Sequence, residues 1–302
     1  GGQSNPTYKI VTDSKNLVLR RKPPGKLLPS AHAVDREYKV ITALYETDVP
    51  VPKTYGLCED NEIAGTAFFV MDFLDGDLFW NPMIPSLSNQ DRTEIYQNKN
   101  KTLALLHGVD YKKIGLEDYG KPGNYVARQV ARWSKQYRAS ETDDIEAMNN
   151  LIDWLPKNIP DDDETSIVHG DYRLDNMILK NNQVMGILDW ELSTLGHPIA
   201  DFSYHCLSWR TQEAFWDQAK LKELGVPSEK EYMDMYCENT GKDLSKNWEF
   251  YMAFNMFKIA GILQGILGRV RDGTASSKHA EDRGMMVYPL SEAAWNTIKE
   301  NF

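Results

Sequence analysis

The sequence predicts an α+β protein with its strands concentrated in a small amino-terminal part and its helices in a larger carboxy-terminal part. Short apolar runs between turn residues fill the region up to residue 75, whereas apolar residues recur at helical spacing from residue 89 onward. At 302 residues, 41% of them hydrophobic, the chain can build a core in each of two lobes. We therefore expect an amino-terminal lobe at 1–75 and a helical lobe at 76–302.

Composition and charge exclude several classes of protein. A formal charge of −10 argues against a nucleic-acid partner, because binding to nucleic-acid phosphates depends on basic surface. The longest apolar region, 251–270, is interrupted by Asn255, Lys258 and Gln264, which predicts a buried helix rather than a membrane span. Three scattered cysteines without a C-x-x-C pair, and an amino end without signal-peptide features, favour a cytoplasmic protein with no disulfide framework or structural zinc.

The first expected elements are two strands at 9–12 and 17–20, joined by a turn at 13–16, and a helix at about 31–46. The apolar stripe of this helix contains Val34 and Ile41, with Glu37 between them. A carboxylate that points inward needs a partner. On spacing alone, Glu37 could pair with a basic residue of the sheet or, at the edge of the stripe, with Arg36 or Lys39.

The next elements are a buried strand at 66–71, an unbroken apolar run, and then helices at 91–107 and 124–139. Arg128, Arg132 and Lys135 lie at i, i+4 and i+7 of the second helix, so their charges share one face. This stripe suits either an anionic ligand or a solvated surface. The acidic, proline-containing segment 143–165 is expected to be an exposed connector.

The most informative stretch is Ile167-Val168-His169-Gly170-Asp171-Tyr172-Arg173-Leu174-Asp175-Asn176, followed by Ile187-Leu188-Asp189-Trp190-Glu191. The residues between these motifs alternate in polarity and predict a hairpin, which would bring its two ends together. Asp171 could then accept a proton, while Asn176 and Asp189 converge on a cation. Phosphoryl transfer needs this arrangement, because its catalysis depends on positioning and charge neutralisation.

The motifs resemble the protein-kinase pattern H-R-D-L-x-x-x-N and D-F-G, with Gly170 in place of Arg and Trp190-Glu191 in place of Phe-Gly. The H-G-D and D-W-E variants are similar to the aminoglycoside phosphotransferase and choline kinase superfamily, and the chain most resembles kinase-like domains associated with acyl-CoA dehydrogenases. The resemblance implies a protein-kinase-like two-lobe fold, with a small antiparallel sheet in one lobe and helices in the other. It also places a further strand before Gly1.

The resemblance assigns roles to individual residues. Asp171 would be the catalytic base, and Asn176 and Asp189 would bind Mg²⁺. The ATP-binding positions would be Ser4, Asn5, Arg20, Glu37, Met71, Asp72 and Leu74, with an Arg20–Glu37 ion pair in place of the usual Lys–Glu pair. His169 and Asp201 would support the loops structurally. Glu191 and the stripe of Arg128, Arg132 and Lys135 would lie near the substrate.

These features predict an ATP- and Mg²⁺-dependent kinase of a small-molecule hydroxyl. The short distance from Asp189 to Asp201 leaves no room for an activation segment on which a protein substrate could dock. The basic stripe and the resemblance favour a hydroxyacyl-CoA as acceptor. An aminoglycoside, choline or another amino-alcohol is the alternative, and a nucleotide-binding pseudokinase that regulates a dehydrogenase is an alternative of another class.

Overall fold

The computed structural model describes residues 5–25, 32–275, 277 and 279–302, and Ser4 lies outside this part of the chain. The chain forms two compact units. Unit 1 comprises Gly1–Lys121, Ser166–Leu195 and Asp217–Gly241, and unit 2 comprises Pro122–Thr165, Gly196–Trp216 and Lys242–Phe302. The mixture of antiparallel strands and helices confirms the predicted α+β class. The predicted lobes, 1–75 and 76–302, divide the chain at a single point, whereas each unit is made of three segments. The lobe boundary at residue 75 therefore stays a prediction.

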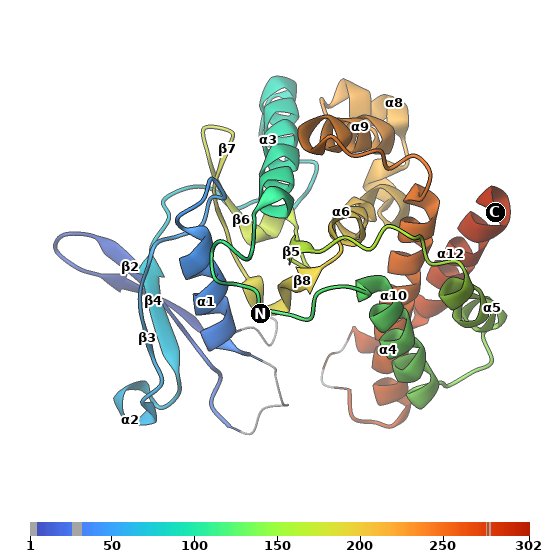
Figure 1. Ribbon diagram of the computed structural model, residues 1–302, viewed down its shortest axis with the longest axis horizontal. Helices are drawn as coiled ribbons and strands as arrows, with labels where there is room; N and C mark the ends of the chain where they lie inside the picture. Colours follow the sequence, from blue (N-terminus) through green and yellow to red (C-terminus); the bar gives the residue numbers. More distant parts are fainter. Residues whose placement is uncertain (1–4, 26–31, 276, 278) are drawn as a thin grey trace. The chain divides into compact units, whose positions relative to one another are not determined.

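Unit 1 begins with a four-stranded antiparallel sheet in the order β1-β2-β4-β3 (Figure 1). The predicted strands correspond to β1 (Thr7–Val11), β2 (Asn16–Arg21) and β4 (Phe68–Asp72), each within two residues of its expected bounds. Strand β3 (Thr54–Cys58) was not predicted. The short helix α2 (Asn61–Ala64) connects it to β4. Gly56 inside β3 weakens its strand signal, because glycine has no side chain to pack on a sheet.

Helix α1 (Val34–Leu44) packs against β3 and β4 and is shorter than predicted. Its buried residues lie three or four positions apart, so one face of the helix closes over the sheet: Val34, Glu37, Val40, Ile41 and Leu44. The carboxylate of Glu37 is therefore buried with this face. This is the inward position that pairing with a basic residue of the sheet requires. Tyr45, which follows the last residue of the helix, is 43% exposed and does not belong to this face.

The rest of unit 1 surrounds the two motifs. Helix α3 (Asn89–Gly108), capped by Ser88, matches the predicted helix and packs against α9 (Glu229–Thr240), with α8 (Gln218–Glu223) before α9 in the chain. Strands β6 (Met177–Lys180) and β7 (Gln183–Ile187) form the predicted hairpin, and β5 (Ser166–Val168) pairs with β8 (Thr194–Gly196). The hairpin turns at Asn181 and Asn182, both with positive φ, as in a tight two-residue turn.

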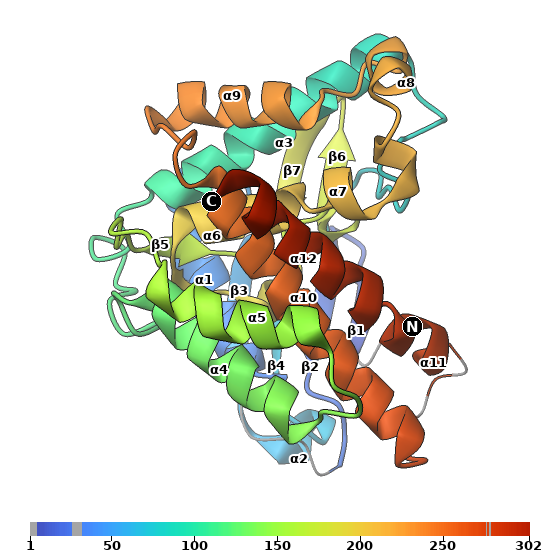
Figure 2. The ribbon, with the colours of Figure 1, turned by 90° about the vertical axis from the view of Figure 1, so that its right-hand side faces the viewer.

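Unit 2 is helical and is built around α10 (Trp248–Arg271), which packs against α4 (Tyr125–Ala139), α6 (Pro198–Cys206), α11 (Ala280–Met285) and α12 (Val287–Asn301) (Figure 2). Among the described residues, only α10 is long and apolar enough to cross a membrane, yet 72% of its most apolar window is buried inside the protein. The predicted buried helix is therefore confirmed. The short helices α7 (Ser208–Thr211), η1 (Leu155–Lys157) and η4 (Glu213–Phe215) complete unit 2.

The prediction that 143–165 is an exposed connector is wrong in part. Helix α5 (Glu146–Trp154) lies in this segment and packs against α12, with Ala147, Met148 and Leu151 buried. The buried residues of α5 are spaced by three and four positions, as in an amphipathic helix, but the many acidic residues of the segment favoured the prediction of an exposed connector.

Candidate active site

The two motifs meet at the open end of the β6–β7 hairpin in unit 1. Met177 pairs with Ile187 across the hairpin, and the Leu188 amide donates to the Asn176 carbonyl at 2.8 Å. These bonds fix the chain just before Asp189, which has a left-handed backbone with φ of 61°. The predicted closure of the hairpin is confirmed, and it brings the second motif beside the first.

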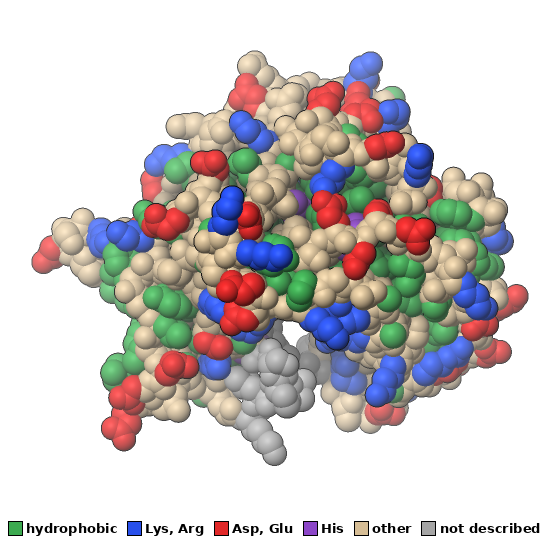
Figure 3. Space-filling view, in the orientation of Figure 1, with side chains coloured by type: hydrophobic (Ala, Val, Ile, Leu, Met, Phe, Trp, Pro, Cys, Tyr) green, Lys and Arg blue, Asp and Glu red, His purple; other side chains and the backbone are tan. Residues whose placement is uncertain are grey.

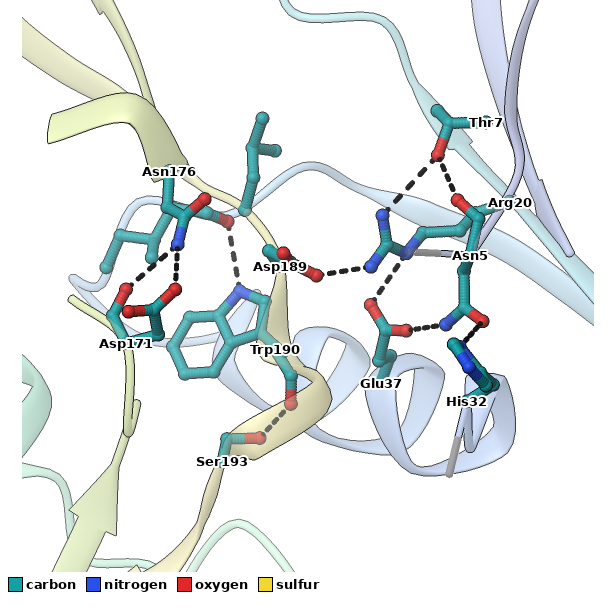
Figure 4. Close-up of polar contacts among 12 residues, drawn as sticks. Asn5, Thr7, Arg20, His32, Glu37, Asp171, Asn176, Asp189, Trp190 and Ser193 are labelled. Carbon is teal, nitrogen blue, oxygen red and sulfur yellow. Dashed lines mark hydrogen bonds and ion pairs between the residues drawn. The ribbon is translucent and has the colours of Figure 1, made fainter. Parts of the chain in front are cut away.

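Asp171 and Asn176 form a direct pair. The Asn176 amide Nδ2 donates to Asp171 Oδ2 at 3.1 Å and to the Asp171 backbone carbonyl at 2.9 Å. Because Nδ2 faces Asp171, the Oδ1 of Asn176 points away from that carboxylate (Figure 4). The Asp171 side chain is 26% exposed, so a hydroxyl compound can reach it. The Asp171 carboxylate and the Asn176 Oδ1 atom therefore face different directions (Figure 4).

Asp189 lies between this pair and a buried ionic cluster (Figure 4). Arg20 Nη2 contacts Asp189 Oδ1, and Arg20 Nε lies 2.8 Å from Glu37 Oε2. Arg20 Nη1 also donates to Thr7 Oγ1 at 3.4 Å. The predicted Arg20–Glu37 ion pair is therefore present, and the edge pairing of Glu37 with Arg36 or Lys39 is not formed. One guanidinium group connects β1, α1 and the Asp189 loop.

The Asn5 side chain extends the cluster on the far side of Glu37. Its Nδ2 donates to Glu37 Oε1 at 2.5 Å, and its Oδ1 lies 3.1 Å from His32 Nδ1. An amide oxygen only accepts, so His32 Nδ1 is the donor. Burial raises the pKa of Glu37 to about 7, against the opposing charge of Arg20. The sequence analysis missed His32 and Thr7, whose contacts are long-range and leave no spacing signal.

His169 binds backbone groups of both motifs. Its Nε2 lies 2.9 Å from the Leu188 carbonyl and must donate, while its Nδ1 accepts from the Asp171 amide at 3.2 Å. The ring is fully buried and packs against Trp190 with 4.9 Å between ring centroids. Both nitrogens contact backbone groups, in keeping with the structural role that stays a prediction for His169.

Gly170 explains why the kinase arginine is replaced in this chain. Its φ is 81°, and a Cβ at this position would lie 2.8 Å from the Leu192 carbonyl oxygen. The backbone after Asp189 forms the short helix η3 (Trp190–Leu192), which packs this closely against the loop that carries Asp171. Only glycine satisfies both the dihedral angle and the contact.

The other predicted residues of unit 1 are placed as follows. Glu191 is exposed, and loss of water around its carboxyl group together with the charge of Asp189 raises its pKa. The Met71 side chain is buried on β4, and Asp72 accepts a hydrogen bond from the Tyr55 hydroxyl at 2.7 Å. Leu74 packs against the hairpin, because a Cβ on Gly186 would lie 2.2 Å from its Cδ1. Their contacts with a nucleotide remain predictions.

The remaining predicted residues belong to unit 2. Arg132 and Lys135 are exposed on α4, whereas Arg128 is half-buried and donates to the Gly123 carbonyl. Figure 3 shows Lys and Arg side chains gathered where α4 reaches the surface. Asp201 is buried on α6. Its predicted support of the Asp189 loop, and the predicted substrate contacts of α4, stay predictions.

Comparison with known proteins identifies similar chains. The model of the family described as "Phosphotransferase enzyme family" matches residues 1–236. Mouse acyl-CoA dehydrogenase family member 10 is 45% identical over 309 residues, which cover 100% of this chain and 29% of the mouse protein. The chain spans between 29% and 40% of the length of the first curated relatives that it matches.

Solved structures have the same fold. A Ralstonia eutropha structure provisionally named an aminoglycoside phosphotransferase has a TM-score of 0.92 and 49% identity, covering 100% of this chain and 91% of that one. The aminoglycoside phosphotransferase APH(4)-Ia, in a ternary complex with ADP and hygromycin B, has a TM-score of 0.66 and 11% identity, covering 98% of this chain and 92% of that one. These likenesses confirm the predicted protein-kinase-like fold.

Proposed function

Because this chain belongs to the phosphotransferase enzyme family, we propose that it transfers the γ-phosphoryl group of ATP to a hydroxyl group of a small molecule. The observation that carries the proposal is the arrangement around Asp189. The Asp171–Asn176 pair lies on one side of this carboxylate and the Arg20–Glu37 pair on the other (Figure 4). A proton acceptor, two oxygen ligands and a cationic group for phosphate are thus collected in one unit.

The donor set fits Mg²⁺. This ion commonly takes one or two carboxylates from the protein and completes its shell with phosphate oxygens and water. Asn176 Oδ1 and the Asp189 carboxylate supply two oxygen ligands, and the described residues contain no group of three or more His, Cys, Asp or Glu that could hold a metal alone. When bound, the ion would neutralise phosphate charge.

Arg20 is suited to hold the nucleotide phosphates. A guanidinium group presents five donors and binds phosphate in a bidentate way. Its Nε lies 2.8 Å from Glu37 Oε2, and its Nη2 contacts Asp189, so the group is held between these two carboxylates. The ADP bound in the APH(4)-Ia structure supports ATP as the donor, since that protein has the same fold.

The proposed reaction needs one proton acceptor. The acceptor oxygen forms a bond to the γ-phosphorus as the bond between that phosphorus and the β–γ bridging oxygen breaks, and ADP leaves with that oxygen. Asp171 orients the hydroxyl and takes its proton through Oδ1, since Asn176 binds only Oδ2 and the nearest cation, Arg173 Nε, lies 4.0 Å from Oδ1.

We propose a hydroxyacyl-CoA as acceptor, and an aminoglycoside or amino-alcohol as the runner-up. The names of the curated relatives support the former, as does the positive charge on α4, which would attract an anionic acceptor and repel a polycation. Thermal shift against CoA thioesters and aminoglycosides separates the two. Stabilisation by aminoglycosides alone would reverse the ranking.

The proposal is tested by ATP turnover with a panel of hydroxyl compounds. Asp171→Ala should lower kcat by about 10²- to 10⁴-fold, the usual contribution of a general base, and should still bind the nucleotide. Asp13→Asn, a change in the exposed β1–β2 turn, is the matched control and should keep full activity. A rate unaffected by Asp171→Ala would rule out its proposed role.

A pseudokinase is the second candidate, favoured by the contact of Arg20 with Asp189. This contact engages Asp189 Oδ1, one of the two oxygens of the proposed metal ligand, and in a pseudokinase it would be a permanent structural bridge. Nucleotide binding by the wild-type protein with no transfer to any acceptor in the panel would support this candidate.

A further inference from the structure

Leu192 combines exposure with a fixed backbone. Its side chain is 58% exposed, although single exposed leucines are common on protein surfaces and need no explanation. What sets Leu192 apart is its place in the chain, three residues after Asp189 and directly after Glu191. An aliphatic residue thus directly follows the D-W-E motif in the chain.

The backbone contacts place Leu192 next to the proton acceptor. A Cβ built on Gly170 would lie 2.8 Å from the Leu192 carbonyl oxygen and 3.1 Å from its Cβ. Gly170 immediately precedes Asp171. Leu192 therefore lies in van der Waals range of the residue before the catalytic carboxylate.

Buried groups on both sides hold this backbone in place. Ser193 is 4% exposed, and its hydroxyl donates to the Trp190 carbonyl at 2.5 Å (Figure 4). The Tyr119 hydroxyl lies 2.5 Å from the same Ser193 oxygen, and Trp190 Nε1 donates to the Ile187 carbonyl at 3.0 Å. Leu192 is thus exposed on a rigid support, which is the condition for shaping a binding site.

We propose that Leu192 is a specificity-determining residue that packs against an alkyl segment next to the hydroxyl of the acceptor. This inference rests on the proposed kinase function and narrows its substrate class. A polyhydroxylated or polycationic acceptor would leave Leu192 in water, whereas a secondary alcohol with an aliphatic arm would cover it. Asp171, the proposed proton acceptor, supplies the polar contact of the hydroxyl end.

The test is a series of hydroxyacyl-CoA thioesters, and of the corresponding free hydroxy acids, in which the alkyl arm beyond the carbinol carbon grows from methyl to butyl. Each methylene that becomes buried should raise kcat/KM about three- to four-fold in the wild-type protein. Leu192→Ser should reduce this gain to less than two-fold per methylene. Leu192→Met, of similar volume and polarity, should retain it.

Ile63→Ser is the matched control, because Ile63 on α2 is 69% exposed and lies outside the site. It should leave the chain-length dependence as in the wild-type protein. A gain per methylene that is the same in Leu192→Ser and wild type, or a wild-type rate that does not change with chain length, would overturn the inference while leaving the kinase function intact. Absence of transfer to every acceptor would instead contradict the proposed function itself.

Discussion

Two groups of charged side chains, the Arg20 cluster of unit 1 and the α4 stripe of unit 2, are held in opposite ways. Arg20 and Glu37 are 9% and 1% exposed, and Arg20 contacts residues of β1, α1 and the Asp189 loop, whereas Arg132 and Lys135 are exposed. A buried ion pair carries a large desolvation penalty that its partners must offset, while an exposed charge is screened by salt. The stability of the Arg20 cluster therefore depends on the exact placement of its partners. The α4 stripe can affect a charged molecule only through its net positive charge.

The largest effect is expected from Arg20→Met. It leaves Glu37 buried without its cationic partner, and breaking a buried pair in this way typically costs about 3–5 kcal/mol of unfolding free energy. Urea unfolding at pH 8 measures the loss. Arg20→Lys keeps the positive charge but not the planar set of N–H donors, and it should lower the unfolding free energy by less than Arg20→Met. Equal losses for the two variants would mean that charge contributes nothing to the cluster.

A smaller effect is expected in the pH dependence of stability. The pKa of Glu37 is raised from 4.5 to about 7 in the folded chain. Between these values the folded state keeps a proton that the unfolded state has released, so this group makes the unfolding free energy fall as pH rises.

Glu37→Gln should remove that fall, a change on the order of 1–3 kcal/mol between pH 5 and pH 8. Urea unfolding at the two pH values measures it, with exposed Glu59→Gln as the control. An unchanged pH slope in Glu37→Gln would show that the carboxyl of Glu37 is charged throughout this range.

The smallest effect on stability is expected from Arg132→Ala combined with Lys135→Ala. Exposed charges contribute little, so the unfolding free energy should change by less than about 0.5 kcal/mol. If the stripe attracts an anionic acceptor, KM for CoA thioesters should rise at low salt and the difference should vanish at high salt. Arg138→Ala, on the same helix but paired with Glu141, is the control. A difference that persists at high salt would indicate direct contact instead of long-range attraction.

The sequence was informative where local spacing carries the signal. The spacing of Asp171 and Asn176 within one motif and the alternating polarity of the hairpin were both readable in the sequence, and the structure contains both. The helical spacing of Glu37 left an inward and an edge position open, and the structure has the inward one. Strand β3 lacked such a signal because of its glycine, and α5 was masked by acidic neighbours.

The rest of the site depends on contacts between distant parts of the chain. The link from His32 through Asn5 to Glu37 joins side chains up to 32 positions apart, and Arg20 reaches Asp189 across 169 positions. No periodicity records which side chains meet across such separations. Gly170 was visible as a substitution in the motif, but the close approach of Leu192 that requires it could be known only from coordinates.

The closed end of the β6–β7 hairpin is tied to α3. Asn182 accepts a hydrogen bond from Asn98 at 3.0 Å and donates to Asp91 at 2.7 Å and to Glu94 at 2.9 Å. The paired strands form a stiff arm between this anchor and the opposite end, where Asn176 and Asp189 are attached. A displacement of α3 would therefore carry Asn176 and Asp189 along together, so that the distance between these two residues is preserved even when the hairpin tilts.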